Sequence, residues 1–139
     1  MIVVDTNVLS AVIQSKPDDR VERWLSDLRP KSGVMCAPVL NELLFLAEKH
    51  TMRHRSDRVA RQFGTILEEK FSDDVLPFDE RAARICAFVR AQQVVRGQTR
   101  QAYDMMIAAI CMVNQLPLAT CNLKDFEGLG LEIVDPRVA

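Results

Sequence analysis

The opening stretch "MIVVDTNVLS", residues 1–10, decides the fold. Residues 2–4 form a short apolar run rich in β-branched side chains, which predicts a buried strand. An acid, a hydroxyl and an amide, Asp5, Thr6 and Asn7, follow without a spacer. These groups either cap the next helix or form one corner of a catalytic site.

The composition is that of a soluble globular protein. The chain has 139 residues and is 48% hydrophobic, which predicts a single domain over residues 1–139 with a sizeable core. No apolar run approaches the roughly 20 residues of a membrane helix, and the first residues lack the pattern of a signal peptide. We therefore expect a cytoplasmic protein without membrane contact. The four cysteines form no CxxC pair, which argues against thiolate zinc and favours reduced thiols, mostly in the core.

Short apolar runs alternate with helical patterns along the chain. Strands are predicted at residues 2–4, 34–37, 75–76, 116–119 and 131–134. Helices are predicted at about 8–13, 18–28, 38–50, 56–71, 80–96 and 101–114. This alternation predicts an α/β fold, a three-layer α/β/α sandwich around a mainly parallel sheet of four to five strands. In such sheets ligands bind at the carboxyl ends of the strands, where Asp5 is placed.

Two further acids have apolar helical neighbours. Glu42 is followed by Phe45 and Leu46 at helical spacing, and Asp104 precedes an apolar run at 105–113. Carboxylates on such stripes are expected to point inward, where a lone charge is protonated, paired or bound to a metal.

Two readings of these acids stay open. Taken singly, Asp5 could cap the following helix, and Asp104 could pair with Arg100 one turn earlier. Taken together with Glu42, they form an oxygen-only set, which suits Mg²⁺ or Mn²⁺ rather than zinc. Such a cluster fits metal-assisted phosphoryl chemistry.

The stretch "ATCNLKDFEG", residues 119–128, follows a predicted strand and should reach the same edge of the sheet. Thr120, Asn122 and Asp125 supply short polar groups there. Asn122 could simply cap a helical turn, with Asp125 three residues later. Alternatively these side chains lie at the site, as catalytic groups or on its rim.

A basic run lies between residues 49 and 61. Arg53, Arg55, Arg58 and Arg61 are its arginines, and Asp57 is its only acid. A local patch of this kind can bind phosphate although the net charge of the chain is −1. The alternative is a solvated helix face.

Four motifs in order resemble one known family. They are "VVDTNVLS", "NELLF" with Glu42, "AYDMMIAA" with Asp104, and "LATCNLKDFEG". Together with "LPFDERAA" and "LEIVDP" they resemble the PIN domain of VapC-type toxins, including the Fit-type subgroup, from bacterial toxin–antitoxin modules. The resemblance spans nearly the whole chain.

The resemblance implies a Mg²⁺- or Mn²⁺-dependent endoribonuclease that hydrolyses RNA with metal-activated water. It implies that Asp5, Glu42 and Asp104 hold the metal, with Thr6, Asn7 and Thr120 as site support. The catalytic set would also include Asn122, which stands where some members have aspartate, and Asp125. A cognate antitoxin, a homodimer and a hetero-oligomer with the antitoxin are further expectations.

Two other functions are considered. An aspartate-nucleophile phosphatase would also place an acid after the first strand, but it requires a second acid at position 7, which is Asn7. A non-catalytic interaction protein, whose acids bind a structural cation, is the alternative from another class. For dimerisation, the apolar side chains of Leu43, Phe45, Leu46 and Val59 are candidates, unless they belong to the core.

Overall fold

The computed structural model describes residues 1–139 and contains one five-stranded sheet in which all neighbours are parallel. The strand order is β3-β2-β1-β4-β5. The strands are β1 (Ile2–Val4), β2 (Gly33–Cys36), β3 (Phe71–Leu76), β4 (Leu118–Ala119) and β5 (Ile133–Val134). The predicted α/β class and parallel sheet are confirmed.

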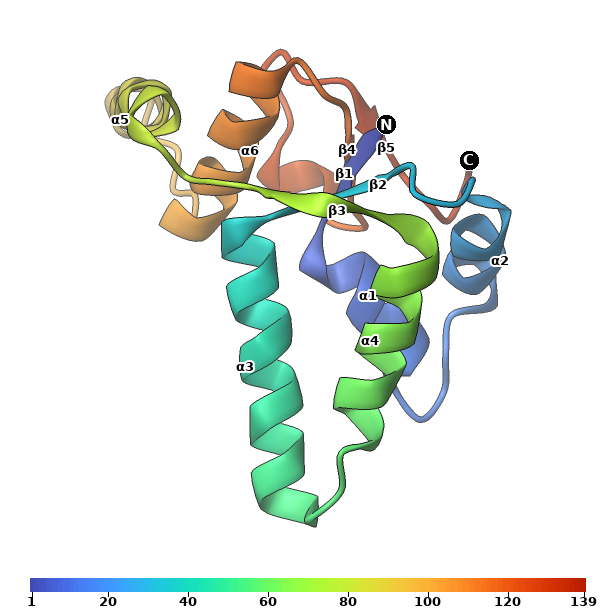
Figure 1. The fold of residues 1–139 in the computed structure, drawn as a ribbon. Coiled ribbons are helices and arrows are strands. Elements are labelled where there is room, and N and C mark those ends of the chain that lie inside the picture. Colours follow the sequence, from blue (N-terminus) through green and yellow to red (C-terminus); the bar gives the residue numbers. More distant parts are fainter.

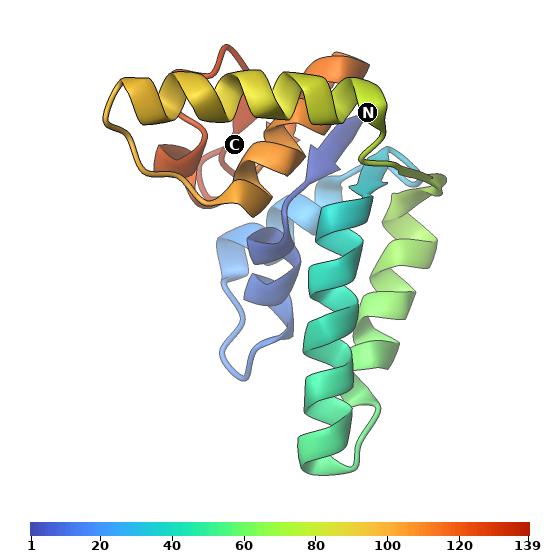
Figure 2. The same cartoon turned by 90° about the vertical axis from the view of Figure 1, so that its left-hand side faces the viewer.

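Helices cover both faces of the sheet (Figure 1). They are α1 (Thr6–Ile13), α2 (Asp19–Asp27), α3 (Ala37–His54), α4 (Arg58–Lys70), α5 (Glu80–Val95) and α6 (Ala102–Asn114), with a short 3-10 helix, η1 (Leu123–Asp125). α1, α3 and α4 lie on one face, and α5 packs against α6 on the other. Figure 2 shows α3 and α4 as an antiparallel pair that extends away from the sheet. None of the helices is long and apolar enough to cross a membrane.

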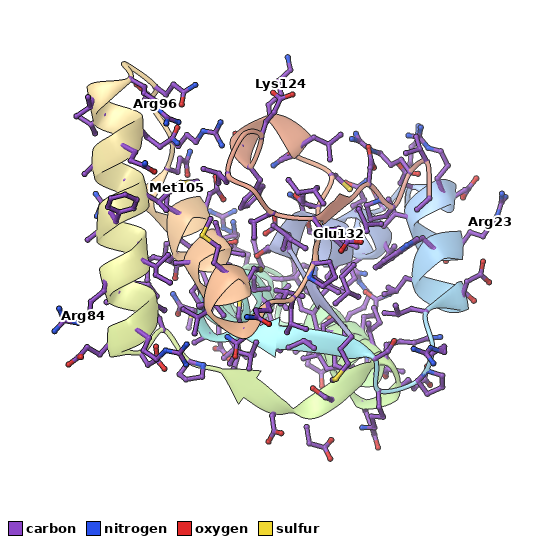
Figure 3. The ribbon with its side chains drawn as sticks, turned by 90° about the horizontal axis from the view of Figure 1, so that it is seen from above. Arg23, Arg84, Arg96, Met105, Lys124 and Glu132 are labelled. Carbon is purple, nitrogen blue, oxygen red and sulfur yellow. The ribbon has the colours of Figure 1, made fainter.

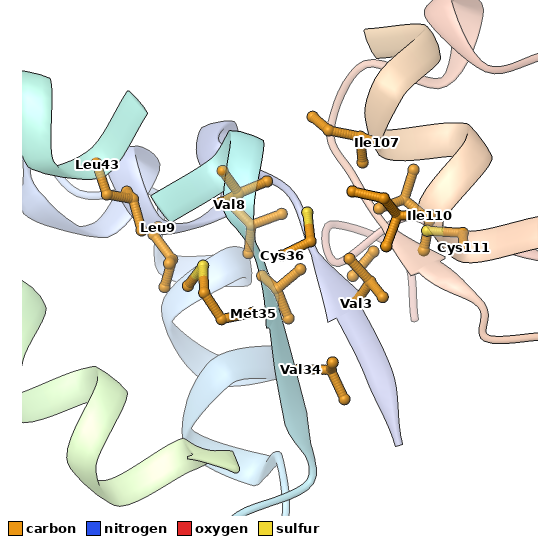
Figure 4. Close-up of a cluster of buried hydrophobic side chains, with 14 of the residues drawn as sticks. Val3, Val8, Leu9, Val34, Met35, Cys36, Leu43, Ile107, Ile110 and Cys111 are labelled. Atoms are coloured by element: carbon orange, nitrogen blue, oxygen red, sulfur yellow. The ribbon is translucent and has the colours of Figure 1, made fainter. Parts of the chain in front are cut away.

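The core lies between the sheet and these two helical layers (Figure 4). β1 is the central strand, and Val3 and Val4 are fully buried between β2 and β4. Burying each such side chain contributes about 1.5–3 kcal/mol. Three of the cysteines are buried and all four are free, as expected. Burial raises the pKa of the Cys36 thiol to about 12, so this thiol is unreactive.

Two element boundaries differ by four residues from the sequence-based expectation, and the other shifts are smaller. β3 begins at Phe71, directly after α4, whereas a strand was expected only at 75–76. Its polar residues Asp73 and Asp74 masked it, because β3 is an edge strand whose side chains are largely exposed. α3 continues to His54 and ends where Arg55 adopts a left-handed conformation, with φ of 50°.

The register of the sheet brings two distant segments together. Val4 pairs with Ala119 across β1 and β4, and the amide of Asp5 donates to the carbonyl of Ala119 at 2.9 Å. Asp5 and Thr120 therefore leave the sheet side by side at its carboxyl edge. A parallel sheet presents its ligand-binding groups at this edge.

Candidate active site

Asp5 is a buried carboxylate whose orientation is fixed by three hydrogen bonds. The residue is only 4% exposed to solvent. Oδ1 accepts from the Thr6 amide at 2.8 Å, and Oδ2 accepts from Thr120 Oγ1 at 2.9 Å and Asn7 Nδ2 at 3.0 Å. Asp5 is thus the N-cap of α1, as one reading of the sequence held. Capping uses only part of the acceptor capacity of Oδ1, which leaves a lone pair for a further partner.

Thr120 and Asn7 connect the start of α1 to the loop after β4. Thr120 Oγ1 donates to Asp5 and accepts from Asn7 Nδ2 at 3.2 Å and from the Asn122 amide at 3.1 Å. Asn7 Oδ1 accepts from the Cys121 amide at 3.0 Å. The Thr120 hydroxyl therefore uses its one donor and both acceptor positions.

Removing this hydroxyl is expected to disturb the site. Thr120→Val should lower the free energy of unfolding by about 1–3 kcal/mol, because it removes a hydrogen bond from the buried Asp5 carboxylate and the acceptor of the part-buried bonds from Asn7 Nδ2 and the Asn122 amide. Thr120→Ser keeps the hydroxyl and is the matched control. Urea unfolding of both variants measures the difference. Equal stability of the two variants would show that the hydroxyl network contributes nothing.

Three more acids lie near Asp5. Glu42 is on the second turn of α3, Asp104 is on the first turn of α6, and Asp125 ends η1. Burial, and to a smaller extent the charges of Asp5, Asp125 and Glu42, raise the pKa of Asp104 to about 6. Burial also raises the pKa of Asp5, to which Glu42 adds, although hydrogen bonds from Thr120, Thr6 and Asn7 oppose this shift. The four acids therefore form one electrostatic cluster.

No basic side chain neutralises this cluster. Arg100, the alternative partner for Asp104, instead donates Nη1 to the carbonyl of Asp125 at 2.8 Å and Nη2 to the carbonyl of Glu127 at 2.6 Å. The pairing of Asp104 with Arg100 is therefore not formed. Arg100 holds the loop that carries Asp125, a contact that the sequence did not reveal because both acceptors are backbone carbonyls more than 20 residues away.

The carboxylates do not converge on one point. No three side chains of histidine, cysteine, aspartate or glutamate are arranged closely enough to hold a metal ion. Both oxygens of Asp5 face hydrogen-bond donors. Like charges also favour separation of the acids. The sequence thus predicted the shared location of the acids but not this arrangement.

The donor set nevertheless suits a hard divalent cation. The groups at this edge are oxygens, their negative charge has no basic partner, and Thr6 Oγ1 is buried without a hydrogen-bond partner. Mg²⁺ is typically held by one or two carboxylates together with several waters, so it does not require three converging side chains. A water within such a shell could also satisfy the Thr6 hydroxyl.

The loop after β4 does not form the predicted capping arrangement. Asn122 precedes η1, but its side chain makes no capping hydrogen bond. The Asp125 amide instead bonds to the Asn122 carbonyl at 3.1 Å. Local capping therefore does not account for these two side chains.

The predicted RNA-binding arginines lie at the far end of the α3–α4 pair, away from the acids. Arg53 and Arg58 line the same hollow. Arg61 pairs with Asp57 at 2.9 Å, and Arg55 ends α3. The four side chains therefore do not form one uniform patch.

Comparisons with known proteins identify the family of the chain. The family model described as "PIN domain" matches residues 2–129. "VapC ribonuclease Y4jK" of Sinorhizobium fredii is 33% identical over 137 residues, with 98% of this chain and 97% of the relative covered. "tRNA(fMet)-specific endonuclease VapC" of Shigella flexneri is 31% identical over 130 residues, with 92% and 91% covered.

A solved structure shows the same architecture. The crystal structure of FitAcB from Neisseria gonorrhoeae aligns with a TM-score of 0.82 at 28% identity and covers 98% of both chains. The chain belongs to the PIN domain family, and within that family to the VapC type. Members of this type are named as ribonucleases and endonucleases.

Proposed function

We propose that the chain is a Mg²⁺- or Mn²⁺-dependent endoribonuclease and the toxin of a toxin–antitoxin pair. The observation that carries this proposal is the uncompensated acidic cluster around the buried Asp5, at the carboxyl edge of the parallel sheet. The family of the chain and the activities named for its relatives support it.

Asp5, Glu42 and Asp104 would hold the cation, directly or through water. When bound, the cation neutralises the phosphate charge and lowers the pKa of the attacking water. Asp5 needs little reorganisation for this role, since Thr120, Asn7 and the Thr6 amide already fix its carboxylate. Correct orientation of the reacting groups is a large part of such catalysis.

Asn122 and Asp125 contribute from the loop after β4. The Asn122 amide is tied to Thr120, and Arg100 holds the carbonyl of Asp125, so the loop keeps both side chains near the acidic edge. There they orient the water or the scissile phosphate. Hydrolysis places the water oxygen on phosphorus, breaks one P–O bond and gives a proton to the leaving oxygen.

Mapping RNA ends tests this proposal in cells. Brief induction of the wild-type chain should create new 5′ ends at defined positions in total RNA, and induction of Asp5→Asn should not. Identical ends in both samples at equal protein levels would contradict the proposal.

A cognate antitoxin is the proposed partner. A similar chain from Neisseria gonorrhoeae was solved as FitAcB, and another from Salmonella typhimurium was solved in DNA-bound VapBC. A groove of about 560 Å³ between α1, α2 and α4 offers an apolar floor that includes Val12, Leu25 and Ile66. An antitoxin segment would lie in this groove. Coexpression with the upstream open reading frame should yield a stable complex by size exclusion.

We also propose that the chain forms a homodimer. The structure reduces the number of apolar side chains that can serve the dimer interface. Leu43 and Val59 are 1% and 7% exposed and belong to the core, so they do not serve an interface. Phe45 is 62% exposed on α3, and Leu44 beside it is 56% exposed. Leu46 is half-buried and packs against the core, so Phe45 is the exposed member of the sequence-based set, and Leu44 and Met52 are further exposed apolar side chains on α3.

A further inference from the structure

A second hollow with a basic lining lies between α1, α3 and α4, toward the end of the helical pair that points away from the sheet. It has a volume of about 330 Å³ and an apolar floor. We call it the basic pocket, and its basic side chains are Lys49, His50, Arg53, His54 and Arg58. No aspartate or glutamate lines it, so its charge differs in sign from that of the acidic cluster.

The cations of the basic pocket are not paired with acids. Lys49 and Arg53 form no salt bridge, and the Lys49 ammonium lies 5.2 Å from the centre of the Phe45 ring. Arg58 donates to the neutral Gln62 Oε1 at 2.9 Å. Arg61 differs from these cations, because it lies outside the pocket lining and is paired with Asp57. The positive charge is therefore available to a ligand.

His50 and Arg58 leave a hydrogen bond unmade in either neutral tautomer of the imidazole. Arg58 Nη2 lies 3.4 Å from His50 Nε2, and His50 Nδ1 is buried without a partner. If Nε2 accepts from Arg58, then Nδ1–H is a buried donor with no acceptor. If Nε2 carries the proton, two donors face each other. An anion between Nε2–H and Nη2–H would accept from both groups.

The basic pocket lies on the same face of α3 as the acidic cluster. Leu46, Lys49 and Arg53 follow Glu42 at four, seven and eleven residues, which places all four side chains on one helical stripe. At about 1.5 Å per residue, Lys49 and Arg53 are about 10 and 17 Å along the axis from Glu42. A chain that crosses the acids and follows this stripe would reach the pocket within a few nucleotides.

We propose that the basic pocket binds a phosphate group of the RNA strand, a few nucleotides from the phosphate that is cut. This inference rests on the proposed endoribonuclease function. Two guanidinium groups suit phosphate, because their planar donors match its oxygens. The pocket thereby supplies the attraction for RNA that the acidic cluster itself lacks.

RNA binding tests this assignment in an Asp5→Asn background, which separates binding from cleavage. The probe is a fluorescein-labelled single-stranded RNA of about 20 nucleotides, followed by anisotropy in Mg²⁺. Arg53→Gln/Arg58→Gln is the test variant. The matched control is Arg23→Gln/Arg84→Gln, which removes the same charge from α2 and α5 at opposite sides of the molecule (Figure 3). Thermal unfolding verifies that both variants are folded.

The test variant should bind about tenfold more weakly than the control, and its slope of log K against log salt should be smaller by about 1. Equal affinity and equal slopes for the two variants would overturn the assignment of the basic pocket as a phosphate site, but they would not contradict the proposed endoribonuclease function. Absence of RNA binding and cleavage by the folded wild-type chain would overturn both. Unchanged RNA affinity with weakened antitoxin binding would assign the pocket to the protein partner instead and overturn the inference.

Discussion

Asp5→Asn is expected to lower the rate of RNA cleavage by at least about a thousandfold while the protein stays folded. The substitution removes a charge from the proposed cation site but preserves the size of the side chain. Asparagine can still accept from the Thr6 amide through Oδ1. Its Nδ2 would replace the oxygen that accepts from Asn7 Nδ2 and from the Thr120 hydroxyl, so two hydrogen bonds are lost, but a buried charge is removed at the same time.

Cleavage of a fluorescent RNA by purified protein measures this effect. Asp73→Asn is the control, because the side chain of Asp73 is 93% exposed and pairs only with Lys31 on the surface. It should cleave at the wild-type rate. A folded Asp5→Asn protein that retains more than about a tenth of the wild-type rate would contradict the assigned role of Asp5.

Asp104→Asn is expected to abolish cleavage and, without metal, to stabilise the protein by about 2 kcal/mol at pH 7.5. Burial and three neighbouring acids raise the pKa of Asp104 to about 6 in the folded state. At neutral pH the folded protein therefore carries an unfavourable charge, which asparagine removes. A gain of this size raises Tm by roughly 6 °C for a chain of this length.

The pH dependence of this gain has a defined sign. Because the folded pKa of Asp104 is raised, its contribution is favourable below the unfolded pKa of about 4 and is lost as the pH rises through about 6. Urea unfolding in chelator should thus show a large difference between Asp104→Asn and wild type at pH 7.5 and little near pH 4. A variant that is less stable than wild type at pH 7.5 would contradict this account of Asp104.

Much of the fold could be predicted because its signals are local. The apolar run 2–4, the acid that ends it and the alternation of strands and helices are each visible within a few residues. The full length of the edge strand β3 was not visible in this way. Only half of the residues of a solvent-facing strand need to be apolar, and Asp73 and Asp74 interrupt the pattern. Phe45 was equally misleading, since its helical spacing from Glu42 suggested an inward face that the structure does not show.

The site was predicted by residue type, whereas its contacts depend on the sheet register. That register places Thr120 against Asp5 across more than 100 residues, which no sequence window contains. Arg100 contacts backbone carbonyls, so its role leaves no side-chain pattern. The basic pocket divides the arginine run into paired and unpaired members, a distinction that only the packing of α1, α3 and α4 creates.

Metal dependence of RNA cleavage shows whether the acidic cluster holds a catalytic cation. Purified wild-type protein, freed of metal with a chelator, is incubated with labelled RNA while Mg²⁺ or Mn²⁺ is added back in steps, beside Asp5→Asn. We expect no cleavage in chelator, a saturable rise in rate with either ion, and no rise for Asp5→Asn. Cleavage that survives thorough chelation would contradict metal-dependent catalysis. Absence of cleavage at saturating metal, while the antitoxin still binds, would also contradict it and would favour a non-catalytic interaction protein.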